Sequence, residues 1–264
     1  DRVGRGMLLT ANGRALLPRA RRILAEVRDV EHNLERDIHE GVGALVVGAI
    51  PTMAPYLVPP AVDHVRRSMP GCDISVREEF TDPLIELVAS SEVDCAIVST
   101  PIEHERIVAE VIGSEPLLVV APADQRTPEV ALDQLRGKAT VALEELHCLA
   151  QQIQGFCAAH RIAPRVSCQA AQLATVVELV ALGLGISIIP EMAAAAHNDQ
   201  RVRYAPLADD ALRREVAIAW RKDRTRGRAG VAFAEAVRQV LKSERVHLPG
   251  RSPEGRRRKA ASRA

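Results

Sequence analysis

Hydrophobic positions along the chain follow two different rhythms. Between residues 10 and 38 apolar side chains recur every three or four residues, as on one face of a helix. The members of this stripe are Leu16, Ala20, Ile23, Val27, Val30, Leu34 and Ile38. Thr10 stands where a helix cap is expected. The narrow stripe with charged flanks favours a coiled-coil-like partner, and the alternative is an amphipathic helix packed on its own chain.

After residue 43 the rhythm changes, and short β-rich runs alternate with helical segments. Strands are predicted at 44–50, 73–78, 95–100, 116–121, 139–144, 165–170, 185–190, 202–207 and 215–220. Helices are predicted near 56–69, 82–91, 149–160, 172–182 and 229–243. The alternation favours a mainly parallel α/β protein. Two similar sets of elements predict two lobes with a cleft between them that can hold a small ligand.

Composition and charge narrow the picture further. Apolar residues make up 47% of the 264 residues but aromatics only 2%, so the core must be built from Ala, Val, Leu and Ile. The net charge of +1 favours no class of charged partner. Arginines gather near the start, and the basic Pro/Gly/Ser-rich tail at 246–264 is expected to be disordered. No apolar run is long enough to span a membrane and no leader opens the chain, which favours a cytoplasmic protein.

The five cysteines form no CxxC pair and no Cys/His set with zinc spacing, so neither a disulfide scaffold nor a metal or cofactor site is expected. Cys72, Cys95 and Cys168 lie in or beside apolar runs and are expected to be small buried residues. The remaining two, Cys148 and Cys157, lie in the segment "HCLAQQIQGFC". Spacing alone leaves two interpretations of this pair open, ordinary core residues or a chemical switch.

The spacing of that pair has a mechanical consequence if the segment is helical. Nine residues of helix rise about 13 Å along the axis. A disulfide needs Cα atoms within about 7 Å of each other. The helix would therefore have to unwind for Cys148 and Cys157 to bond, and Gly155 is a low-cost place to bend.

Several stretches in order resemble the LysR-type transcriptional regulators. They are "LLTANGRALL", the long helix, "GAIPTMAPYLVPPAVDHVRRSMP" and "GLGISIIP", and the resemblance covers nearly all of residues 1–245. It implies a winged helix-turn-helix whose recognition helix is missing from this chain, a dimerising linker helix and a two-lobed effector domain of periplasmic-binding-protein type. The implied parts are a wing remnant at 1–9, the linker helix at 10–40, the effector domain at 44–245, lobe I at 44–115 plus 217–245, and lobe II at 116–216.

Within that family the chain is most similar to the OxyR-type peroxide sensors. The resemblance rests on "IPTMAPYLVP", "LEELHCLAQQIQGFC" and "LRREVAIAW". It implies that Cys148 is the peroxidatic thiol, beside His147, and that Cys157 is the resolving thiol. Leu146 stands where these sensors usually have glycine, and Ala150-Gln151 replaces their usual Arg-Asp pair.

The same resemblance implies an effector site formed by Thr52, Thr81, His147 and Arg214. Helix capping is the alternative for both threonines, and an exposed position is the alternative for His147 and for Arg214, whose neighbour Arg213 could face inward instead. Arg2 and Arg5 are candidate phosphate contacts in the wing remnant.

The leading hypothesis is therefore a transcription regulator that senses hydrogen peroxide through a reversible Cys148–Cys157 switch. A second hypothesis is a LysR-type regulator that binds a small metabolite in the interlobe cleft, lined by Thr52 and Thr81. An enzyme of the same fold or a thiol peroxidase is disfavoured, because no second-substrate motif, phosphate loop or metal set is present. The expected partners are promoter DNA, hydrogen peroxide and a second copy in a dimer or tetramer; RNA polymerase is a candidate partner, and no membrane is expected.

Overall fold

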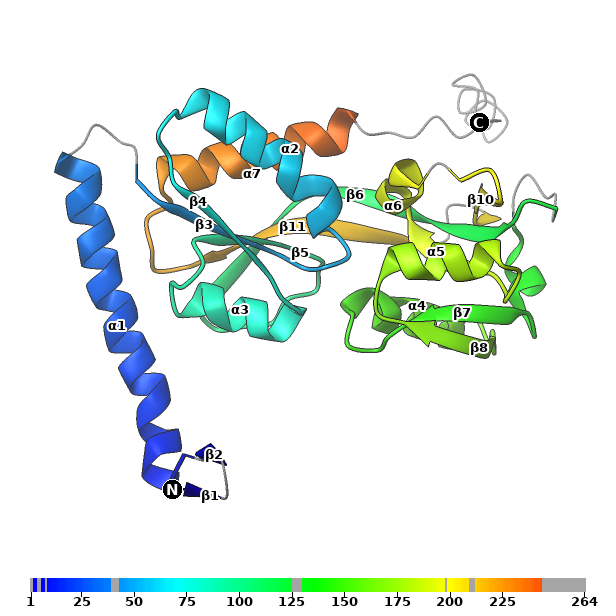
Figure 1. The fold of residues 1–264 in the computed structure, drawn as a ribbon, viewed down its shortest axis with the longest axis horizontal. Helices are drawn as coiled ribbons and strands as arrows, with labels where there is room; N and C mark the ends of the chain where they lie inside the picture. The colour runs from blue at the N-terminus through cyan, green and yellow to red at the C-terminus, as the bar shows by residue number, and fades with distance from the viewer. Residues whose placement is uncertain are drawn as a thin grey trace, which may run out of the picture. The chain divides into compact units, whose positions relative to one another are not determined.

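The computed structural model describes residues 2–3, 6–7, 9–38, 43–124, 130–197, 199–208 and 212–243. Residue contacts divide the chain into two compact units, which are described separately below (Figure 1). Unit 1 comprises Asp1–Val111 with Ala217–Val237, and unit 2 comprises Ile112–Val216 with Arg238–Ala264.

Unit 1 begins with a short hairpin followed by a long helix. Strand β1 (Arg2–Val3) pairs antiparallel with β2 (Gly6–Met7), and α1 spans Ala11–Ile38. The hydroxyl of Thr10 accepts a hydrogen bond from the backbone N–H of Gly13 at 3.0 Å. That bond satisfies one of the unpaired donors in the first turn of the helix. The predicted long helix and its threonine cap are therefore confirmed.

The sheet of unit 1 is built around strand β3 (Leu45–Ala49). It pairs parallel with β4 (Ile74–Glu78) and with β5 (Cys95–Val98). The last part of β11 (Arg213–Arg221) pairs antiparallel with β5. Strands β3 and β5 are almost entirely buried, because helices cover both faces of this sheet.

Three helices cover the sheet of unit 1. Helices α2 (Ala54–Ser68) and α7 (Arg228–Ser243) lie on one side of it, and α3 (Thr81–Ala89) lies on the other (Figure 1). The contact with α3 is very close: a Cβ atom added to Gly48 would come within 2.5 Å of the Leu84 side chain. Glycine in the middle of β3 is therefore required by packing rather than by backbone conformation.

Unit 2 combines an antiparallel and a parallel strand set. Strand β6 (Ile107–Pro122) pairs antiparallel with β9 (Ser187–Pro190) and with β10 (Val202–Pro206). Strand β7 (Ala139–Leu143) pairs parallel with β8 (Arg165–Ala170). A short turn at residues 144–147 connects the end of β7 to the helix that carries the candidate thiols.

Within the described residues, four helical segments lie entirely in unit 2. They are a 3₁₀ turn at Leu132–Leu135, α4 (Cys148–Ala159), α5 (Leu173–Ala181) and α6 (Glu191–Ala196). Helices α4 and α5 both contact β7. The apolar side of α4 therefore packs toward the strands, and its N-terminus follows the end of β7.

Three predictions about the fold need correction. The strands are mixed rather than mainly parallel, because the pairs of β6 and the β5–β11 pair are antiparallel. The strand predicted at 116–121 begins earlier, at Ile107. The prediction missed residues 107–114 because most of them are half-exposed and do not form a long apolar run. The short helix α6 was not predicted, because its six residues are too few to establish a period.

Membrane-spanning helices and clusters of metal ligands are both absent from the described residues. Within these ranges no helix is long and apolar enough to cross a bilayer. In the same part of the chain, no three His, Cys, Asp or Glu side chains gather as metal ligands would.

Candidate functional site

The start of helix α4 positions the first candidate thiol. His147 is the N-cap residue, with extended backbone angles, and Cys148 is the first helical residue. The carbonyl of His147 accepts the first helical bond, from the N–H of Ala150 at 3.0 Å. Cys148 therefore lies among the unpaired backbone N–H groups of a helix N-terminus, where a negative charge is favoured.

The imidazole of His147 is buried rather than exposed. Only 5% of the residue is accessible, and its Nε2 lies 2.8 Å from the carbonyl oxygen of Ala171. A carbonyl only accepts, so Nε2 carries the proton in this contact and the ring is held in one orientation. The alternative of a surface histidine at this position is wrong.

The two thiols of α4 lie in different surroundings. Cys148 is half-buried, and Cys157 is buried with 6% of its surface accessible. Burial raises the pKa of the Cys157 thiol above its ordinary value. Cys157 is therefore held in its neutral form at neutral pH, while Cys148 remains accessible to a small solute.

The helix also keeps the two thiols apart. Helix α4 runs without a break through both positions, so its axis rises by about 13 Å between them. Nine steps of about 100° also place the side chains on opposite faces of the helix. All five cysteines are free thiols in this state. A Cys148–Cys157 bond would require α4 to unwind.

Leu146, Ala150 and Gln151, where the sequence departs from the OxyR pattern, differ in exposure and contacts. Leu146 is 65% exposed, and Ala150 is buried. The amide of Gln151 donates to the backbone carbonyl of Glu145 at 3.1 Å. Gly155 is exposed, and a Cβ added there would meet nothing within 4 Å. Gly155 itself therefore makes no side-chain packing contact that bending at this position would break.

Arg214 is completely buried and faces inward, whereas Arg213 is exposed. Its Nε donates to the Glu115 carboxylate at 2.6 Å, and the other oxygen of that carboxylate accepts the backbone N–H of Met192 at 2.9 Å. The exposed alternative for Arg214 is therefore wrong. Sequence reasoning missed Glu115, although an acidic residue directly before the apolar run "PLLVVA" was a usable signal.

A hydrogen bond connects α4 to the strand of Arg214. The amide of Gln152 donates to the backbone carbonyl of Arg213 at 3.1 Å. The second turn of α4 therefore contacts the first residue of β11. His147, Cys148 and Arg214 all belong to unit 2, and this contact brings their two elements together.

The two threonines belong to unit 1. Thr52 is buried with 2% of its surface accessible, and α2 begins after Met53 with no side-chain cap. Helix α3 likewise has no side-chain cap. The Oγ1 atom of Thr81 is buried and makes no hydrogen bond within the described part of the chain. Neither threonine is therefore the N-cap residue of the helix that follows it, since these residues are Met53 and Phe80.

The remaining sequence candidates have mixed outcomes. Cys95 is buried as expected, but Cys72 and Cys168 are only half-buried. Cys72 lies just before strand β4, and Cys168 lies in strand β8. Arg5 and the side chain of Arg2 lie outside the described residues. The tail at 246–264 lies outside them as well.

Comparison with known proteins adds independent information. Residues 39–242 match the family described as the LysR substrate binding domain. The hydrogen peroxide-inducible genes activator of Haemophilus influenzae is 28% identical over 247 residues, which cover 92% of this chain and 82% of that protein.

Solved structures agree with the sequence comparison. The reduced regulatory domain of OxyR from Pseudomonas aeruginosa superimposes with a TM-score of 0.68 at 28% identity and covers 75% of this chain and 98% of its own. An OxyR variant from Corynebacterium glutamicum with hydrogen peroxide bound superimposes with a TM-score of 0.72 at 25% identity, covering 92% of this chain and 78% of its own.

Proposed function

We propose, from the premise that this chain belongs to the LysR substrate-binding-domain family of transcriptional regulators, that it senses hydrogen peroxide through a reversible Cys148–Cys157 thiol–disulfide switch. The observation that carries the proposal is the asymmetry of α4. An accessible thiol at its N-terminus follows a buried, oriented histidine, and a buried thiol lies nine residues further along. The names of its relatives, hydrogen peroxide-inducible genes activators, support the same effector.

The chemistry requires two steps at sulfur. The Cys148 thiolate attacks one peroxide oxygen, so an S–O bond forms, the O–O bond breaks, and the departing hydroxide takes a proton to become water. Cys148 is then a sulfenic acid. The sulfur of Cys157 attacks it, an S–S bond forms, and the second oxygen leaves as water. Two thiols are oxidised, and one peroxide is reduced to two waters.

The surroundings of Cys148 suit the first step. The unpaired N–H groups at the start of α4 favour a thiolate, and a fixed imidazole lies in the preceding residue. Arg214 forms an ion pair with Glu115 on the strand that Gln152 contacts. In this proposal Thr52 and Thr81 orient the peroxide oxygens, since a hydroxyl both donates and accepts a hydrogen bond.

The second step explains why a local reaction would be transmitted. The disulfide cannot form while α4 is a continuous helix, so its formation would require residues 148–157 to unwind and to pack differently. A covalent bond that selects one of two packings is a switch.

Titration of the reduced protein with hydrogen peroxide, followed by counting free thiols, tests the proposal. Loss of two of the five thiols per chain is expected, with Cys72, Cys95 and Cys168 unchanged. If all five thiols persist at a peroxide concentration that oxidises a control thiol in a parallel sample, the switch is wrong.

A second candidate function is binding of a small metabolite by the same effector domain. The observation that favours it is the buried Oγ1 of Thr81, which has no hydrogen-bond partner among the described residues and would gain one from a polar ligand. Unchanged thiols together with a ligand-induced rise in melting temperature would favour this alternative.

Self-association through α1 belongs to the same proposal. Leucine and isoleucine side chains on this helix are exposed, among them Leu16 and Ile23 at 63% each. Burying such a side chain against a second copy is worth about 1.5–3 kcal/mol. We expect sedimentation to show a dimer or larger at tens of micromolar, and the Leu16→Glu, Ile23→Glu double variant to shift it toward monomer. A parent protein that sediments as a monomer would refute helix-mediated association.

Regulation of transcription completes the proposal. In this proposal the dimer binds promoter DNA, and formation of the disulfide in α4 changes how it does so. RNA polymerase is a candidate partner in that response.

A further inference from the structure

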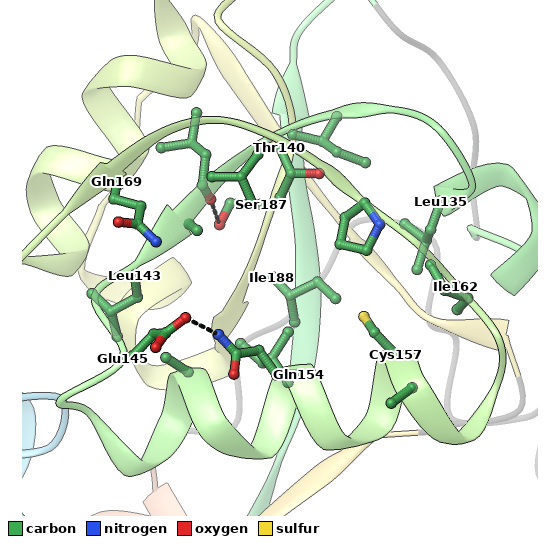
Figure 2. A pocket seen from close by; sticks show the side chains of 18 residues that line it. Leu135, Thr140, Leu143, Glu145, Gln154, Cys157, Ile162, Gln169, Ser187 and Ile188 are labelled. Carbon is green, nitrogen blue, oxygen red and sulfur yellow. Dashed lines mark hydrogen bonds between the residues drawn. The ribbon is translucent and has the colours of Figure 1, made fainter.

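A pocket of about 260 Å³ lies behind α4, within unit 2 (Figure 2). One wall is formed by α4, from which Ile153, Gln154 and Cys157 reach the cavity. The opposite wall is formed by strands β7, β8 and β9, with Val166 and Ile188 among its lining residues. We call this cavity the α4 pocket. It is separate from the accessible side of Cys148, which is not among its lining residues.

The pocket has an apolar end and a polar edge. Leu135, Ile162 and Cys157 lie at one end, and Glu145 and Gln169 lie at the other (Figure 2). At the polar edge the amide of Gln154 donates to the Glu145 carboxylate at 3.1 Å. An apolar body with one polar group at its end matches this division.

The charges of the lining residues determine which polar group of a ligand the pocket would favour. No described residue that lines the pocket carries a positive charge, and Glu145 carries the negative one. The hydroxyl of Ser187 already donates its proton, to the carbonyl of Val141 at 2.7 Å. The polar edge therefore offers the Glu145 carboxylate as an acceptor and the Gln169 amide as both donor and acceptor, and its single negative charge favours a cation or a neutral donor over an anion.

Size sets the scale of the occupant. A dry cavity of about 150 Å³ accommodates benzene. By proportion, a cavity of 260 Å³ holds a molecule of about ten non-hydrogen atoms. Water in its apolar end would find few partners, so an apolar group that displaces it gains affinity.

We propose that the α4 pocket is a second ligand site, for a small amphiphile with an apolar body and an uncharged or cationic hydrogen-bond donor at one end, whose binding opposes the switch. The opposing effect follows from the architecture. Ile153, Gln154 and Cys157 form a wall of the pocket only while α4 is helical, and the Cys148–Cys157 bond requires α4 to unwind. A ligand that binds the helical state alone stabilises the reduced form. This second clause rests on the proposed switch, whereas the site itself does not.

Three probes that share one body test the site. We would titrate 2-phenylethanol, 2-phenylethylamine and phenylacetate into the reduced protein by calorimetry or NMR. The alcohol and the amine are expected to bind one site per chain, and the carboxylate about tenfold more weakly than the amine. Glu145→Gln should reduce that preference, whereas Glu144→Gln, an acidic neighbour outside the lining, should leave it unchanged.

Variants that fill the cavity locate the binding. Ile153→Trp on α4 should abolish it, and Val166→Trp, at a half-exposed position of β8, should do the same if the first variant folds poorly. Leu182→Trp places the same side chain at an exposed position outside the lining and should bind as the parent does. Absence of saturable binding up to about 10 mM, or binding that both filling variants retain, would overturn the site.

A second arm separates the site from the switch. With the alcohol at ten times its dissociation constant, the rate of peroxide-driven loss of two thiols should fall about tenfold in the parent. It should not fall in Val166→Trp. Binding without any peroxide reaction would leave the site intact and sink the proposed function. Thiol loss with no probe binding would do the reverse, and binding that leaves the rate unchanged would overturn the opposing effect.

Discussion

The two ends of helix α4 differ in almost every property that governs thiol chemistry. At the N-terminal end Cys148 is half-buried among unpaired backbone N–H groups and follows a buried histidine. Two and a half turns later Cys157 is buried on the opposite face, lines an apolar pocket and has its pKa raised by burial. Cys148 is the more accessible of the two thiols, and Cys157 is the one that burial keeps neutral.

In the proposed switch, this difference means that α4 keeps the two thiols apart until Cys148 has been oxidised. A buried neutral thiol does not compete for peroxide, because the thiolate is the nucleophile. It becomes useful only when α4 opens. Substitutions that remove one side of this contrast should therefore have distinct effects.

The largest effect is expected from Cys148→Ser. A hydroxyl is nearly isosteric with a thiol but is not oxidised by peroxide, so loss of thiols should stop while the fold is retained. Counting thiols after peroxide measures it, with circular dichroism as the fold control. Cys168→Ser, at another half-buried thiol of unit 2, is the matched variant and should react as the parent does. A serine variant that still changes its proteolysis pattern with peroxide would show that Cys148 is not the sensor.

Cys157→Ala removes the second thiol. It should change the product of oxidation rather than the reaction of Cys148 with peroxide. Cys148 sulfenic acid should accumulate and pass to irreversible sulfinic acid under excess peroxide, because no second thiol condenses with it. The loss of a small buried side chain should cost about 1 kcal/mol of unfolding free energy. Mass spectrometry reads the oxidation state. If oxidation in this variant matches the parent in product and reversibility, Cys157 only fills core space.

Thr81→Val tests whether the Thr81 hydroxyl belongs to the proposed effector site. The substitution removes a buried hydroxyl that has no hydrogen-bond partner among the described residues, so the free energy of unfolding should stay level or rise by about 1 kcal/mol. If the hydroxyl binds peroxide, oxidation of Cys148 should slow, while alkylation of Cys157 in the unfolded protein should not change. A variant that is stabilised and reacts at the parent's rate would remove Thr81 from the effector site.

The smallest effect concerns pH. The pKa of Cys157 is raised in the folded state by burial, whereas the unfolded thiol titrates near 8.5. Above that pH the unfolded chain loses a proton that the native chain keeps, so stability falls as pH rises, by at most about 1.4 kcal/mol per unit for this group.

Below pH 8.5 the contribution of Cys157 is fully present and does not change. Urea unfolding at pH 7.5 and at pH 9.5 should therefore show a smaller alkaline loss in Cys157→Ala than in the parent. Burial also raises the pKa of Cys72 and Cys95, so part of the loss should remain in the variant. Equal losses in the two proteins would contradict a neutral, buried Cys157.

The fold was largely predictable where a period repeats. The helical period of the stripe from Leu16 to Ile38 predicted α1, although Leu16 and Ile23 are exposed. The apolar runs predicted the buried strands β3 and β5, because burial on both faces leaves a direct trace in the sequence. Strand direction leaves no such trace. Chain alternation alone could not show that β6 pairs antiparallel with β9 and β10.

The site was predictable only in part. The order His147, Cys148, Cys157 was visible as a motif, and the rise of an ideal helix was enough to predict how far apart the two thiols lie. Which of two adjacent arginines faces inward was not visible, because it depends on the register of β11 and on Glu115, which lies 99 residues away in the chain. The α4 pocket is formed by residues from five elements and the loops between them, and it has no linear signature.

The most direct test is to map the disulfide and the backbone together. The reduced protein is treated with one equivalent of peroxide, the disulfides are identified by peptide mass spectrometry, and amide exchange is followed over residues 148–157. We predict a Cys148–Cys157 disulfide and faster exchange across that segment, because α4 has to unwind for the bond to form. A stable 148–157 disulfide with unchanged exchange would contradict the unwinding step, and absence of that disulfide would contradict the switch itself.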